Sequence, residues 1–96
     1  MAEQPEAADS APLTLIREHV EWREIEGEIT LLDMRASEYI ALNRTGSLLW
    51  LALAEGATRD HLVGLLVGRF GITAERASAD VDAFLHDLIE RGFVQS

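Results

Sequence analysis

Apolar and polar residues alternate in the first half of the chain. In the segment His19 to Ile25, Val20 and Trp22 fall on one face, and Glu21 and Arg23 fall on the other. A period of two residues is typical of a strand that is buried on one face only. The segment is therefore predicted to be the first strand of a sheet with one solvated side.

A tight hairpin is predicted at Glu26-Gly27, because glycine readily adopts the positive φ that a two-residue turn requires. Residues 29–34 return as the second strand, and the turn sets Trp22 opposite Leu31. After a polar break, residues 39–42 form a short third strand. If the strand order is sequential, this third strand lies at an edge of the sheet.

The second half of the chain has helical spacing, with capping residues before each apolar stripe and glycines after it. The predicted helices run from Asn43 or Thr45 to about Ala54, from Thr58 to Gly71, and from Thr73 to about Arg91. Phe93 and Val94 are expected to fold back on the core. Three strands followed by three helices predict an α+β fold, a three-stranded antiparallel sheet with a winged helix-turn-helix-like layout.

Composition divides the chain into two parts. Residues 1–12 hold no large apolar side chain after Met1, so they are predicted to be a disordered acidic tail, and residues 13–96 form one domain. The N-terminus lacks the layout of a secretory signal, and no apolar run approaches the roughly 20 residues of a membrane span. A cytoplasmic location is expected.

The residue types argue against catalysis. The chain has no cysteine, and His19, His61 and His86 lie in three different predicted elements. Neither metal-ligand spacing nor a glycine-rich phosphate loop nor a nucleophile elbow is present in the sequence. We therefore expect no enzymatic activity, no catalytic residue, no metal and no cofactor.

Charge decides between peptide and nucleic acid as the partner. The formal net charge is −9, from 17 acidic and 8 basic residues, and every basic residue is arginine. The third predicted helix holds more acids than arginines, whereas a helix that reads DNA needs a basic face. Binding to DNA is therefore disfavoured, and so is binding to anionic membranes. An acidic surface attracts a cationic segment instead.

Several motifs resemble the PqqD family. They are Tyr39-x-x-Leu42-Asn43-x-Thr45-Gly46-x-x-x-Trp50, Asp80-Val81-x-x-Phe84-Leu85-x-x-Leu88, and Gly92-Phe93-Val94. The resemblance covers roughly residues 19–94, and it is strongest to the free-standing members of lasso-peptide biosynthesis. It implies a recognition element for ribosomally made, post-translationally modified peptides (RiPPs), which binds a precursor's leader region and presents it to a transglutaminase-like leader peptidase and a cyclase.

The resemblance further implies that the leader adds as a strand to the third strand, with the third helix as the other wall. An unpaired edge can bind an extended peptide through main-chain hydrogen bonds. The residues expected to contact the peptide are Leu32, Met34, Tyr39, Ile40, Ala41, Asp80, Val81, Phe84 and Asp87. Ile40→Pro is expected to remove a main-chain donor from the edge without unfolding the domain.

Three other hypotheses stay open. The chain could instead be a PqqD-type peptide chaperone that partners a radical-SAM enzyme, because that role uses the same fold and the same edge. A winged-helix DNA-binding protein shares the layout but lacks the charge. Without a leader, a bare sheet edge also favours pairing of two copies into a homodimer.

Overall fold

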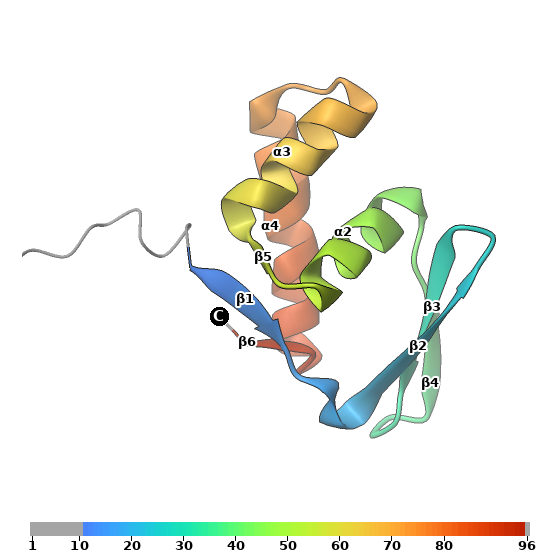
Figure 1. Cartoon of the computed structure of the whole chain (residues 1–96). Coiled ribbons are helices and arrows are strands. Elements are labelled where there is room, and N and C mark those ends of the chain that lie inside the picture. Colours follow the sequence, from blue (N-terminus) through green and yellow to red (C-terminus); the bar gives the residue numbers. More distant parts are fainter. Residues whose placement is uncertain (1–10, 96) are drawn as a thin grey trace, which may run out of the picture.

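The computed structural model describes residues 11–95, and its main sheet is an antiparallel meander in the order β2-β3-β4 (Figure 1). The strands span Val20–Ile25, Glu28–Asp33 and Glu38–Ala41, each within one residue of its predicted bounds. The predicted register is confirmed, since Trp22 pairs with Leu31. Glu26 and Gly27 both have positive φ, 54° and 85°, as the hairpin requires.

Helices α2 (Arg44–Ala54), α3 (Arg59–Phe70) and α4 (Ala74–Glu90) follow the predicted caps. Asn43 rather than Thr45 caps α2, because its side-chain oxygen accepts a hydrogen bond from the Gly46 N–H at 2.7 Å. Thr58 and Thr73 cap α3 and α4 in the same way. The sequence therefore predicted the start of each of these helices, with one of two candidate caps correct for α2.

A second small sheet was not predicted. Strand β1 (Pro12–Leu15) lies between β5 (Ala57–Thr58) and β6 (Val94–Gln95), and pairs antiparallel with both. A 3-10 turn, η1 (Arg17–His19), leads from β1 into β2. The predicted tail lies mostly outside the described residues, and its last residue, Pro12, already belongs to β1.

Helix α2 lies between the main sheet and the other two helices (Figure 1). Its Trp50 is completely buried and makes edge-to-face contacts with Trp22 of β2 and Phe93 at the C-terminal end. Edge-to-face packing is a favoured geometry for aromatic pairs. These rings join the sheet, the central helix and the chain end, so Phe93 and Val94 do fold back on the core as predicted.

Within residues 11–95, no helix combines the length and the apolar character that a membrane span needs. The same part of the chain contains no cluster of three or more histidine, cysteine, aspartate or glutamate side chains that could hold a metal ion.

Candidate functional site

The edge of the main sheet is formed by β4, which pairs only with β3 among the described strands. At its end, the Leu42 N–H donates to the Ile29 carbonyl at 2.8 Å. Hydrogen-bonded pairs alternate along antiparallel strands, so the main-chain groups of Ile40 also face β3. Those of Tyr39 and Ala41 therefore point outward. We call these outward groups the β4 edge.

This register corrects one expectation from the sequence. The Ile40 N–H belongs to the ladder with β3 and is not a donor of the β4 edge. Ile40→Pro would therefore damage the sheet itself, and the donors available to an added strand are those of Tyr39 and Ala41.

Helix α4 is fastened to the hairpin between β3 and β4. The Arg91 guanidinium, at the end of α4, lies 3.7 Å from a carboxylate oxygen of Glu38 and 3.2 Å from Asp87. The Arg35 guanidinium donates to the Arg91 carbonyl oxygen at 3.0 Å. The hairpin turn is itself braced, because Asp33 accepts hydrogen bonds from two main-chain N–H groups that follow it. We call the Arg35, Glu38, Asp87 and Arg91 contacts the hairpin latch.

A cavity lies at the opposite end of β4, between the start of α2 and α4. Its volume is about 280 Å³, and it is lined by Asn43, Thr45, Gly46, Leu49, Asp80, Ala83 and Phe84. Gly46 lies beside Phe84, since an added Cβ would lie 3.4 Å from the Phe84 ring. The hairpin latch joins the end of α4 to Glu38, the first residue of β4, and the cavity places the middle of α4 beside the segment that follows β4.

The acidic residues of α4 differ in their surroundings. Asp82 faces α3 and accepts two hydrogen bonds from Arg59, at 2.7 and 2.9 Å. Hydrogen bonding to the Arg59 guanidinium lowers the pKa of the Asp82 carboxyl below its ordinary value. Asp87 belongs to the hairpin latch. Asp80, on the rim of the cavity, has no ion pair or hydrogen bond with another described side chain. Among the carboxylates of α4, Asp80 is thus the one that lines the cavity without a side-chain partner within residues 11–95.

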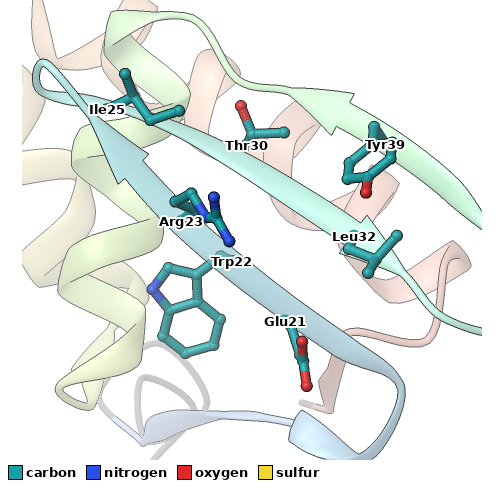
Figure 2. A pocket seen from close by; sticks show the side chains of 7 residues that line it. All are labelled: Glu21, Trp22, Arg23, Ile25, Thr30, Leu32 and Tyr39. Carbon is teal, nitrogen blue, oxygen red and sulfur yellow. The ribbon is translucent and has the colours of Figure 1, made fainter.

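The predicted sheet residues divide between two faces. Ile40 shares the helix-side face with Leu31, its partner across the ladder. Leu32 and Tyr39 pair on the opposite face, together with Ala41. Figure 2 looks onto that outer face, where Leu32 and Tyr39 line a hollow of about 290 Å³ with Glu21, Trp22, Arg23, Ile25 and Thr30. Tyr39 is 75% exposed.

A family model described as coenzyme PQQ synthesis protein D (PqqD) matches residues 28–94. This chain belongs to the PqqD family. The match includes β3, β4 and all three helices, so the resemblance inferred from the sequence is confirmed. No curated protein matches the chain significantly.

Two solved structures share this PqqD fold. TbiB1 in complex with the TbiA(beta) leader peptide has a TM-score of 0.79 and 22% identity, over 86% of this chain and 95% of that one. Lasso peptide synthetase B1 complexed with the leader peptide has a TM-score of 0.77 and 26% identity, over 90% of this chain and 100% of that one. Both confirm the predicted α+β class.

In this PqqD-family chain, the remaining predicted residues have different positions. Met34 follows β3, is 41% exposed, and donates its N–H to the His19 carbonyl. Phe84 is half-buried and lines the cavity, whereas Val81 is completely buried in the core and offers no surface. The nine predicted residues therefore do not form one continuous surface.

Sequence reasoning missed two parts of the site. Ala83 is a small, exposed residue beside Phe84, and it lines the cavity. Arg91 was interpreted only as the end of the last helix, although it anchors the hairpin latch. The four-residue spacing of Asp80 and Phe84, and of Asp87 and Arg91, was the available signal, because such residues share a helix face.

Proposed function

We propose that this chain is a non-catalytic recognition protein that binds the leader region of a ribosomally made precursor peptide in a lasso-peptide pathway. The leader adds as a fourth strand to the β4 edge and lies against α4. One observation carries this proposal: the main-chain groups of Tyr39 and Ala41 point away from β3. Helix α4 lies close to the segment that follows this strand. Strand addition satisfies those groups and gives affinity for any extended peptide.

Side-chain contacts provide specificity in this arrangement. Successive side chains of an added strand point to opposite faces of the sheet. Those on the helix side meet Ile40 and the cavity beside Phe84, where Asp80 favours a lysine or arginine of the leader. Those on the outer side meet the exposed ring of Tyr39. Asp87 contributes negative charge near the hairpin latch.

Delivery to a processing enzyme completes the proposed role. The two structural neighbours are complexes with a leader peptide, and one is a lasso peptide synthetase component. Within a lasso-peptide pathway, the partners in this proposal are a leader peptidase of the transglutaminase-like class and then a cyclase. The family's own description, coenzyme PQQ synthesis, supports a second candidate: a peptide chaperone that partners a radical-SAM enzyme. Both roles use the same binding edge.

Amide hydrogen exchange during a titration with the synthetic leader tests strand addition directly. The Tyr39 and Ala41 amides should exchange in the free protein and become protected when the leader binds, because they gain hydrogen-bond acceptors. The Ile40 amide, already bonded to β3, serves as the internal control. Protection of the Trp22 and Glu24 amides on β2 instead would contradict the proposal, as would binding without any change at β4.

A further inference from the structure

Helix α2 is apolar on all of its sides, although the chain buries only two of them. Residues 48–54 form an uninterrupted apolar run. Trp50 and Leu53 are buried on the core side, and Leu49 is buried beside the cavity shared with α4. Leu48 and Leu51, on the third side, are only partly covered. A helix that is hydrophobic all round is normally buried all round, whereas within residues 11–95 this side is only partly covered.

The uncovered side continues into a shallow groove between α2 and α3. One hollow of about 340 Å³ reaches from Leu48 and Leu51 to Leu65, and a second of about 180 Å³ reaches from the same two leucines to Phe70. Because both hollows share Leu48 and Leu51, they form one apolar surface. We define it, by Leu48, Leu51, Ala52, Leu65 and Phe70, as the α2–α3 face.

The two ends of the α2–α3 face carry opposite charge. Arg44 and Arg69 line its hollow beside Phe70, and Glu55 lines the hollow at the other end. Arg44 and Glu55 are the first residue of α2 and the residue that caps its end. Arg44 lies four residues before Leu48, and Glu55 lies four residues after Leu51, so the two are equally distant from the middle of the Leu48–Leu51 segment. A two-fold axis through that middle would therefore bring the Arg44 of one copy to the Glu55 of the other.

We propose that the α2–α3 face is a homodimer interface, in which the α2 helices of two copies pack antiparallel. The face is self-complementary, as a two-fold interface must be: apolar residues meet at the centre, and arginine meets glutamate at both ends. The chain's own residues 1–12 are a poor occupant, because they hold no large apolar side chain after Met1. The proposal goes beyond leader binding and leaves the β4 edge free in both copies.

The size and charge of the face define what kind of dimer to expect. Small interfaces support weak association, and a net charge of −9 on each copy opposes it further. The dimer should therefore exchange with monomer on dilution.

Sedimentation velocity on the full chain, over a wide concentration range, tests the dimer through a charge exchange. Arg44→Glu alone and Glu55→Arg alone should each weaken self-association about tenfold, because both ion pairs become like-charge contacts. An equimolar mixture of the two variants should restore it, since acid then meets arginine at both ends. Glutamate at the start of α2 and arginine at its end suit the helix dipole, so both variants should remain folded.

Any one of four results would overturn the dimer proposal. The wild-type chain could remain monomeric at every concentration, even if an enzyme partner binds the same face. Self-association could survive both single charge changes, or the mixture could fail to restore it. If Ala41→Pro rather than Arg44→Glu abolishes association, the copies pair through the β4 edge. Leader affinity should be unchanged in both charge variants, so its measurement separates failure of the dimer from failure of the proposed function.

Discussion

The two edges of the main sheet differ in charge and in what lies beside them. The β2 edge carries Glu21, Arg23 and Glu24, all exposed, and the Arg17 guanidinium lies over the Trp22 ring at 5.2 Å. The β4 edge runs through Tyr39, Ile40 and Ala41, with a charge only at the first residue of the strand, and α4 accompanies it. Both edges belong to the same sheet of three strands.

Under the proposed function, this difference accounts for the binding of a peptide at the β4 edge instead of the β2 edge. Charged side chains on an edge strand discourage pairing with other chains, and β2 has this protection. An uncharged edge with a helix alongside offers hydrogen bonds and side-chain pockets at once, and β4 has that arrangement. The sheet therefore carries charged side chains along its β2 edge, whereas its β4 edge is largely uncharged and is joined to α4 by the hairpin latch.

The largest expected effect concerns the stability of the open edge strand. Ile40→Pro should lower the free energy of unfolding by about 3 kcal/mol, because it removes a hydrogen bond of the β3–β4 ladder. Urea unfolding followed by tryptophan fluorescence measures this change. An unfolding midpoint equal to that of the wild type would show that the Ile40 N–H does not belong to the ladder with β3.

The second largest effect concerns leader binding, which we expect at the β4 edge and not at the β2 edge. Ala41→Pro should weaken leader binding at least about a hundredfold, because the proline ring removes an outward donor and obstructs an added strand. Glu24→Pro is the matched control, because it removes an N–H that points outward from β2. Fluorescence anisotropy with a labelled leader should show less than about a twofold change for it. Equal losses in the two variants would remove the distinction between the edges.

A smaller effect on leader affinity is expected from changes in α4, the helix near the β4 edge. Phe84→Ala should weaken leader binding about tenfold, since the ring lines the cavity beside the edge. Ile89→Ala removes an apolar side chain that is 44% exposed and lies outside the cavity on the same helix. Calorimetric titration of both variants should show a loss for Phe84→Ala alone. Similar affinities in the two variants would exclude Phe84 from the contact.

The smallest effect concerns charge on that wall. Asp80→Asn should slow association with a cationic leader by a few-fold at low salt and much less at high salt. Asp82→Asn makes the same change of charge on the α3 side and should alter the association rate less. Stopped-flow measurements at two salt concentrations compare the association rates of the two variants. Identical rates would mean that the net charge of the protein, and not the position of Asp80, determines the rate.

Asp82→Asn should also change how the stability of the fold depends on pH. The pKa of Asp82 is lowered in the folded protein from an ordinary value of 3.8, so its pair with Arg59 stabilises the fold above about pH 4. The contribution is lost as the pH falls through the lowered pKa. Because the Asp82 side chain is 60% exposed, the pair contributes less than about 1 kcal/mol.

The sequence predicted those features that depend on neighbouring residues. Alternation and the Glu26-Gly27 turn set the strand pairing, and the three caps set the helix starts. The β1 sheet escaped prediction because Leu13 pairs with Ala57, and Leu15 with Val94. No local pattern encodes pairing between segments so far apart.

The sequence was sufficient to assign the strand residues of the site to faces of the sheet, but not to predict which helix residues are buried. The register already placed Trp22 and Leu31 toward the core, so strand alternation could have assigned Leu32 and Tyr39 to the outer face. Helical spacing could not show that Val81 is buried while Phe84 reaches a cavity. The bond from Arg35 to the Arg91 carbonyl spans 56 positions and has no signature in the sequence.

A single serine sets the length of the β4 edge. The Ile29 N–H, which faces the β4 side of the sheet, donates to the Ser47 hydroxyl at 2.8 Å instead of to a strand. The chain has already turned into α2 there, so the ladder with β3 ends at Leu42. Five residues from Glu38 to Leu42 extend about 17 Å. If the leader adds to β4 as proposed, this end of the ladder limits the stretch of leader that can be held in register to about five residues.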